Sequence, residues 1–125
     1  MRKIAILGIG QIKIGEHWEK SLREIGGDAA FAAMQDAGIE KVDSLFVGNM
    51  LSPLVNGQNQ LGTFFADWIG LWKQEAVKIE AACGSGAAAF RAALMAVASG
   101  DVESALVVGV ATMTDKAGRD VTGAL

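Results

Sequence analysis

The chain has 125 residues, of which 51% are hydrophobic and 20% charged, and its formal net charge is −3. This length and composition predict one globular domain with a real core. The small negative charge argues against nucleic acid or a membrane as a partner. A single cysteine excludes an internal disulfide, which suits a reducing cytoplasm. We expect no signal peptide and no stretch near the roughly 20 apolar residues of a spanning helix.

The chain begins with a continuous apolar run, Ile4 to Ile9, which predicts a strand buried on both faces of a parallel sheet. Gly8 and Gly10 invite a dinucleotide-binding interpretation. We disfavour it, because Lys13 stands where a third glycine is required. Residues 11–20 then form a polar loop with His17, the only histidine. A lone loop histidine is usually solvated, so we leave it out of the site.

The first predicted helix begins after Ser21, because Glu24 three residues later completes a capping box, and it ends at Gly38. Two interior glycines, Gly26 and Gly27, each cost about 1 kcal/mol against alanine, so close packing is expected to compensate. The expected apolar face consists of Leu22, Ile25, Ala29, Ala32, Ala33 and Ala37. A strand over 42–49 follows, and with the first strand it predicts a right-handed βαβ unit.

The middle of the chain holds a turn-rich piece over 49–60, which contains the only proline, and then a second predicted helix over 58–71. Its apolar stripe is formed by Leu61, Phe64, Phe65, Trp68 and Ile69, and such a stripe is more often core than a cofactor site. Further elements are a strand over 76–82, a helix over 85–99 and an apolar strand over 104–110. Phe90, Leu94 and Val97 are expected to cover one face of that helix. The order β-α-β-α-β-α-β predicts an α/β fold with a mainly parallel sheet and helices on both faces.

The only cysteine, Cys83, falls at the turn between a predicted strand and a predicted helix. The positive end of the helix dipole favours a thiolate there, and cysteines in such places titrate at roughly 3.5–7.5 instead of about 8.5. Gly84 and Gly86 leave room for a substrate carbonyl. The alternative is an inert cysteine that acts as a small buried hydrophobe. Ser85 is expected to cap the helix start.

The segment from Glu80 to Arg91, EAACGSGAAAFR, resembles the active-site segment of the thiolase family. The resemblance is closest to archaeal acetyl-coenzyme A acetyltransferases and to sterol-carrier-protein type thiolases. Matching pieces cover nearly the whole chain: GEHWEKSL at 15–22, VGNML at 47–51, Gly57-Gln58, Val108-Gly109 and MTD at 113–115. The resemblance implies that residues 1–125 are the amino-terminal domain of a thiolase.

The resemblance also implies a chemistry. Cys83 would take the acyl group from acetyl-coenzyme A, with its own backbone N–H helping to hold the oxyanion, and the product would be acetoacetyl-coenzyme A. Coenzyme A thioesters would be substrates, with no cofactor and no metal, and the coenzyme A contacts stay unassigned. The catalytic histidine, a second cysteine and most of the coenzyme A pocket belong to a second half of the family's fold. A carboxy-terminal half or hydroxymethylglutaryl-coenzyme A synthase is therefore an expected partner. A cytoplasmic homodimer or higher oligomer, paired through the strand over 76–82, is also expected.

Two other classes of function stay open at this point. A hydrolase uses a similar strand–turn–helix elbow, but usually within Gly-x-Ser-x-Gly, and Ala81 and Ser85 occupy the glycine positions. A hydrolase also needs an acid and a histidine downstream. Alternatively, the chain is a non-catalytic scaffold that docks a partner enzyme such as hydroxymethylglutaryl-coenzyme A synthase. Acetylation of Cys83 by acetyl-coenzyme A would separate a thiolase from both.

Overall fold

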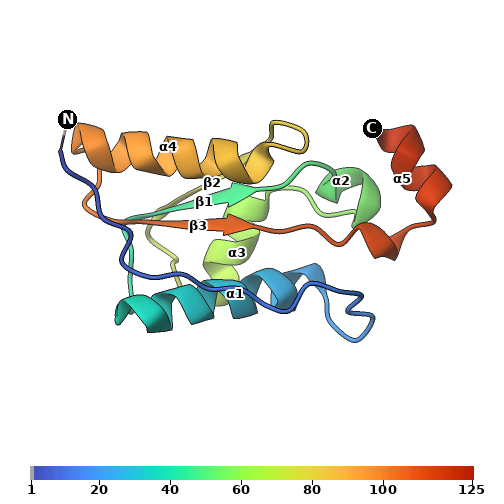
Figure 1. Cartoon of the computed structure of the whole chain (residues 1–125), viewed down its shortest axis with the longest axis horizontal. Coiled ribbons are helices and arrows are strands. Elements are labelled where there is room, and N and C mark those ends of the chain that lie inside the picture. Colours follow the sequence, from blue (N-terminus) through green and yellow to red (C-terminus); the bar gives the residue numbers. More distant parts are fainter. Residues whose placement is uncertain (1) are drawn as a thin grey trace.

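The fold is built on a small parallel sheet that helices cover on both faces (Figure 1). A computed structural model describes residues 2–125. The strands are β1 (Ser44–Gly48), β2 (Glu75–Ile79) and β3 (Ala105–Gly109), in the spatial order β2-β1-β3. The helices are α1 (Leu22–Ala37), α2 (Ser52–Val55), α3 (Leu61–Ile69), α4 (Ser85–Ser99) and α5 (Gly118–Ala124), with a 3₁₀ turn, η1, at Met113–Asp115. The predicted α/β class, the parallel sheet and the helices on both faces are confirmed.

The central strand, β1, organises the two layers of core. All five of its residues are buried, and it pairs in parallel with β2 on one side and with β3 on the other. Leu45 and Val47 belong to a cluster with residues of α1 and α3, whereas Phe46 packs with Ala89 and Ala93 of α4. This alternation follows from the two-residue period of a strand. The sheet therefore separates α4 from α1 and α3.

The first helix begins and ends where the sequence predicts. The Ser21 side chain caps the Glu24 amide while the Glu24 carboxylate accepts from the Ser21 amide, and Gly38 ends the helix with φ of 67°. Gly26 and Gly27 are sites of close packing, as expected. A Cβ at Gly26 would lie 2.5 Å from the Phe65 ring, and one at Gly27 would lie 2.4 Å from the Trp68 indole nitrogen. The two glycines thus let α3 approach α1.

The predicted apolar faces of α1 and α4 are partly wrong. In α1 the buried residues are Leu22, Ile25, Gly26, Gly27, Ala30 and Met34, so Ala29, Ala32, Ala33 and Ala37 are only half-buried. In α4 the expected face of Phe90, Leu94 and Val97 is replaced by Ser85, Ala89, Ala93 and Ala98. The reason is distance, because a helix that approaches a sheet this closely has room for alanine but not for phenylalanine.

The predicted first strand is also wrong, since residues 4–9 form no strand. These residues line a groove of about 530 Å³ together with β3, α1 and α4, and the groove separates them from the free edge of β3. Ile6 and Ile9 are therefore 69% and 76% exposed. The predicted βαβ unit across α1 consequently lacks its first strand.

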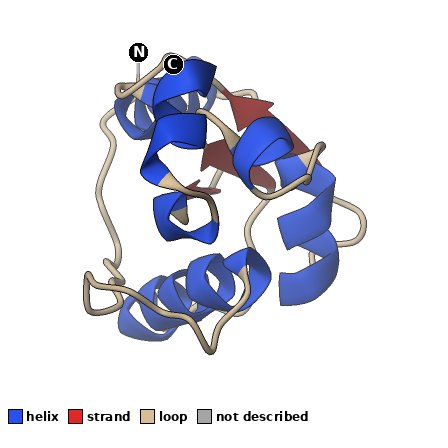
Figure 2. Ribbon diagram, turned by 90° about the vertical axis from the view of Figure 1, so that its right-hand side faces the viewer, coloured by secondary structure: helices blue, strands red, loops and turns tan. Residues whose placement is uncertain are grey.

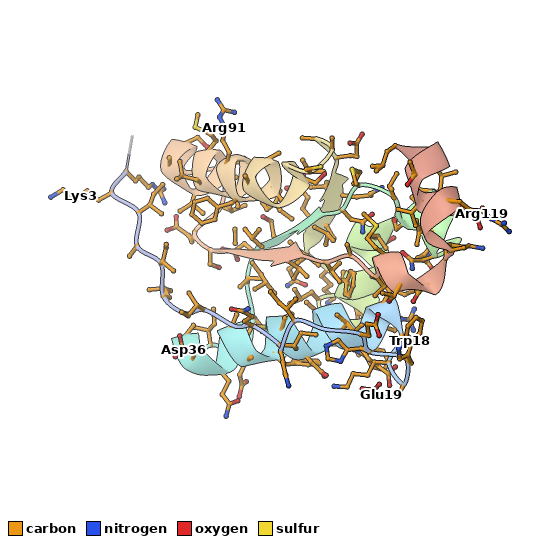
Figure 3. The ribbon with its side chains drawn as sticks, turned by 45° about the vertical axis from the view of Figure 1, so that its right-hand side comes forward. Lys3, Trp18, Glu19, Asp36, Arg91 and Arg119 are labelled. Atoms are coloured by element: carbon orange, nitrogen blue, oxygen red, sulfur yellow. The ribbon has the colours of Figure 1, made fainter. Side chains whose placement is uncertain are left out.

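The amino-terminal segment is held against α1 by its glycines. A Cβ at Gly8 would lie 2.4 Å from the Ala37 amide nitrogen, and one at Gly10 would lie 2.3 Å from the Ala29 oxygen. The Ile9 amide donates to the Asp36 carboxylate over 2.9 Å. In Figure 3, Asp36 lies on α1 beside this extended segment. The two glycines thus serve close backbone packing, which agrees with our rejection of a dinucleotide-binding turn.

The remaining elements differ from the predictions mainly at their ends. α3 is shorter than the predicted helix over 58–71, and its stripe divides into buried Leu61, Phe65 and Ile69 and exposed Trp68. The short α2, with Pro53 in its first turn, lies within the piece that we expected to be irregular. α4 matches its predicted bounds, and Gly100 ends it with φ of 87°.

The capping box of α1 makes stability depend on pH. Hydrogen bonds from the Ser21 backbone and side chain lower the pKa of the fully exposed Glu24. A pKa lowered in the folded state stabilises the fold above the ordinary glutamate pKa, and this stabilisation is lost as pH falls through the folded value. Glu24→Gln should therefore be less stable than the wild type near pH 7, and the difference should shrink as the pH falls below the ordinary glutamate pKa of about 4.3. Urea unfolding at several pH values measures this.

The matched control is Glu75→Gln, which removes an exposed carboxylate at the start of β2. It should not reproduce the pH-dependent difference. A Glu24→Gln variant with the same deficit at pH 3 as at pH 7 would contradict the argument.

Candidate functional site

The carboxyl ends of the three parallel strands meet at one edge of the sheet, and polar residues follow each strand there. Asn49 follows β1, Cys83 lies in the turn after β2, and Thr112 follows β3. Figure 2 looks onto this end of the molecule, with short helices in front of the strands. In open α/β sheets, ligands bind outside this edge. The cysteine singled out from the sequence thus lies where such a fold places its sites.

Cys83 itself is a free, exposed cysteine in the turn between β2 and α4. The predicted position between strand and helix is confirmed. The alternative of a small buried hydrophobe disagrees with this exposure. Reactive cysteines are typically partly exposed, and helix N-termini are among the places where they occur.

The turn that carries Cys83 has an unusual backbone. Ala82 has φ of 48°, one of two non-glycine residues with a positive φ among residues 2–125. The amide of Ala82 donates to the Glu80 carboxylate over 2.6 Å, and the amide of Gly84 donates to the Ala81 oxygen over 2.9 Å. These bonds reverse the chain between the end of β2 and the start of α4 within a few residues.

Ser85 contributes a buried hydroxyl to this turn, not the predicted helix cap. The N-cap position of α4 is Gly84, and no side chain caps the helix. The Ser85 Oγ instead accepts from the Ala81 amide over 2.9 Å and donates to the Ala82 oxygen over 2.6 Å. Its hydroxyl points backward across the turn because the chain before it, not the helix after it, offers both partners.

The start of α4 is pressed onto the end of β1. A Cβ at Gly48 would lie 2.6 Å from the Ser85 backbone oxygen and 2.7 Å from the Gly86 Cα. Both contacts are with backbone atoms, which cannot move to another rotamer as a side chain can. Glycine at position 48 is therefore what lets the helix begin directly over the sheet and brings the Cys83 turn to its edge.

Two asparagines connect the neighbouring loops. Asn49 is 4% exposed, and its side chain donates to the Val110 oxygen over 2.7 Å and accepts from the Ser52 amide over 2.7 Å. Asn56 donates to the Asp115 carboxylate over 2.6 Å. These bonds fix the loop after β1 to the chain after β3. We predicted neither role from the sequence, although for Asn49 its position directly after a buried strand was an available signal.

His17 lies in the loop before α1, which packs on the opposite face of the sheet from α4. Its Nε2 is 2.7 Å from the Lys13 oxygen, in the loop that leads into α1. Trp18 and Glu19, labelled in Figure 3, mark this loop beside α1, whereas α4 and the Cys83 turn lie on the other face of the sheet. Leaving His17 out of the site stays a prediction. Within residues 2–125, no three His, Cys, Asp or Glu side chains gather as metal ligands.

The segment Ala82–Ser99 is long and apolar enough to cross a membrane by length and composition alone, with a mean hydropathy of 1.3 over 18 residues. From the sequence we expected no such stretch. α4 packs Ala89 and Ala93 against β1, but only 22% of the Ala82–Ser99 window is buried. Arg91 points outward from its opposite face (Figure 3). Packing against β1 thus accounts for the alanine face of α4, whereas Phe90 and Met95 remain exposed.

The fold and site define an α/β domain with an exposed cysteine between a parallel strand and the following helix. A 3-oxoacyl-[acyl-carrier-protein] synthase III from Aquifex aeolicus has a similar fold, with a TM-score of 0.71 and 20% identity over 80% of this chain and 32% of that one. Residues 4–124 match the family described as "Thiolase, N-terminal domain". The chain belongs to this family.

Curated relatives agree with this family. The chain is 40% identical to an acetyl-CoA acetyltransferase of Methanothermobacter thermautotrophicus and 43% identical to one of Methanocaldococcus jannaschii, each over 117 residues. It is 32% identical over 111 residues to benzoylsuccinyl-CoA thiolase subunit BbsB of Thauera aromatica. The matches cover 92%, 92% and 86% of this chain but 30%, 30% and 28% of the relatives. The chain therefore spans less than a third of their length.

Replacing the glycine under α4 tests this geometry. Gly48→Ala should lower the free energy of unfolding by roughly 1–3 kcal/mol, because the new methyl group overlaps backbone atoms at the start of α4. Urea unfolding measures the change. Gly118→Ala is the matched control, since a Cβ there meets nothing within 4 Å. Equal unfolding midpoints for the two variants would show that α4 can lift from β1 without cost.

Proposed function

We propose that the protein is a thiolase-type acyltransferase, an acetyl-CoA C-acetyltransferase in which Cys83 is the nucleophile. The observation that carries this proposal is the exposed Cys83 in the turn between β2 and α4 of a thiolase amino-terminal domain. Two curated relatives carry the name acetyl-CoA acetyltransferase. Coenzyme A thioesters are the proposed substrates, and the chemistry needs neither a metal nor a further cofactor.

The proposed reaction proceeds in two steps through a covalent intermediate. The Cys83 thiolate attacks the carbonyl carbon of acetyl-coenzyme A, a new S–C bond forms, and coenzyme A leaves as its thiolate. A base then removes an α-proton from a second acetyl-coenzyme A. The resulting carbanion attacks the acetyl carbon on Cys83, which forms acetoacetyl-coenzyme A and returns the thiolate. The backbone N–H of Cys83 helps hold the oxyanion in both steps.

The second step needs a base that this chain does not offer near Cys83. His17 lies at the opposite face of the sheet, and Cys83 is the only cysteine. We propose that the base comes from protein beyond the part of the relatives that the chain matches, in cis or in trans. Ile6, Leu7 and Ile9 are exposed beside the groove. Large exposed apolar patches usually mark interaction surfaces, so these residues support the packing of further protein against the groove.

Assembly and location follow the same proposal. β2 pairs with β1 along one edge only among the described strands, and its other edge is free. We propose a cytoplasmic homodimer in which the free edges of β2 pair, since an unpaired edge strand readily adds a neighbour. Hydroxymethylglutaryl-coenzyme A synthase stays the proposed docking partner if the chain acts as a scaffold.

Sedimentation equilibrium tests the dimer. The chain should sediment with twice its monomer mass of 13.0 kDa at micromolar concentration. Lys78→Pro should sediment as a monomer, because proline removes an amide from β2 and so blocks pairing between the strands of two copies. A wild-type chain that sediments as a monomer, also when joined to the carboxy-terminal part of a relative, would contradict the proposal.

Acetylation tests the nucleophile. Incubation with acetyl-coenzyme A should add one acetyl group to Cys83, detected by intact mass and peptide mapping, and Cys83→Ala should abolish the addition. The 125 residues alone should give no steady synthesis of acetoacetyl-coenzyme A, because acid–base assistance alone is worth about 10²–10⁴-fold and no base is at hand. Joining or adding the carboxy-terminal part of an archaeal relative should restore turnover.

Two outcomes would count against this assignment. A folded chain that never acetylates Cys83, even with the carboxy-terminal part present, would favour the scaffold. Full turnover by the 125 residues alone would show that the base lies within this chain.

A further inference from the structure

We propose that Ser85 is a positioning residue: its buried hydroxyl holds Ala82 in the left-handed conformation that presents Cys83 at the edge of the sheet. The proposal rests on the proposed function of Cys83 and adds a residue on which the reactivity of that cysteine depends. Ser85 does not contact the reacting atoms. It acts through the backbone of the two residues that precede Cys83.

The hydroxyl is placed to act on this turn and on nothing else. Ser85 is 4% exposed, and its Oγ bridges the Ala81 amide, at 2.9 Å, and the Ala82 oxygen, at 2.6 Å. A buried hydroxyl with both a donor and an acceptor satisfied has one fixed orientation. The contact of Ser85 and Gly86 with Gly48 holds the Ser85 backbone on the sheet. The hydroxyl therefore connects the turn to a fixed part of the fold.

The turn needs such a connection because of Ala82. At φ of 48° the alanine Cβ crowds the following carbonyl, so an alanine here relaxes toward negative φ unless the surroundings oppose it. The Ala82 oxygen also accepts from the Ser85 amide over 3.1 Å. Without the hydroxyl, that backbone bond remains, but the Ala81 amide loses its partner. The restraint on Ala82 φ would then be much weaker.

Rotation at Ala82 bears directly on Cys83, the next residue. It redirects both the Cys83 side chain and the Cys83 amide, which are the proposed nucleophile and the proposed oxyanion donor. Misplacement of a reacting group by about 1 Å can cost about 10²-fold in rate. Loss of the hydroxyl should therefore slow acylation of Cys83 while the core of the domain, on both faces of the sheet, stays packed.

The test compares the rate of Cys83 acetylation by acetyl-coenzyme A in four forms of the whole chain. Ser85→Ala should react at least about tenfold more slowly than the wild type. Ser99→Ala is the matched control, because its hydroxyl bonds the Ala96 oxygen at the far end of the same helix, and it should react at the wild-type rate. Ala82→Gly in the Ser85→Ala background should recover most of the rate, since glycine takes a positive φ without crowding.

Hydrogen exchange provides a readout that does not depend on acetylation. The Ala81 amide should exchange faster in Ser85→Ala than in Ser99→Ala, while amides of β1 exchange alike in both. If the wild type accepts no acetyl group, the proposed function fails, yet this comparison still decides whether Ser85 restrains the turn.

Three results would overturn the inference. The first is a folded Ser85→Ala that acetylates at the wild-type rate or leaves Ala81 exchange unchanged. The second is a slow variant that Ala82→Gly does not rescue, because the hydroxyl would then act by another route. The third is loss of folding in both Ser85→Ala and the double variant, which would make Ser85 a general stability residue.

Discussion

The close contact between the start of α4 and the end of β1 is the constraint on which the site depends. Gly48 has no side chain, so the Ser85 and Gly86 backbone can lie where a Cβ would be. The chain leaving β2 must then reverse within a few residues to enter the helix. This short path runs through the turn at Ala82, where φ is 48°, and leaves Cys83 exposed at the carboxyl edge. The same closeness explains why alanines, not larger residues, form the buried face of α4.

Elements whose signals are local could be predicted from the sequence. The capping box at Ser21, the C-cap glycines and the bounds of α4 depend on residues a few positions apart, and the structure reproduces them. The run from Ile4 to Ile9 failed because hydrophobicity reports burial or packing, not a hydrogen-bonding neighbour. A strand needs a partner edge, and here a groove lies between these residues and β3. Phe90 failed for a related reason, because periodicity does not reveal how closely a helix meets its sheet.

The site divides in the same way. The position of Cys83 was predictable, because a strand pattern, a glycine-rich turn and a helix pattern follow one another directly. The role of Ser85 was not predictable. The direction of its hydroxyl depends on the backbone of Ala82, and an alanine in a sequence does not indicate a positive φ. Serine before a helix usually caps it, but here the cap position belongs to Gly84. Asn49 was missed because its partners, Val110 and Ser52, come together only in the folded sheet.

The proposed reaction requires a nucleophile and a base, and the two differ in how much of the chain is needed to place them. Everything that presents Cys83 lies between Gly48 and Gly86, in three elements that pack on one another: β1, β2 and α4. Such a nucleophile can be complete within a single small domain. A base must approach the substrate from across the site. The only histidine, His17, lies before α1, on the face of the sheet opposite to α4. Nucleophile and base therefore place separate demands on the fold, and this domain meets the first through the backbone of the Cys83 turn and the buried Ser85 hydroxyl that bonds to it.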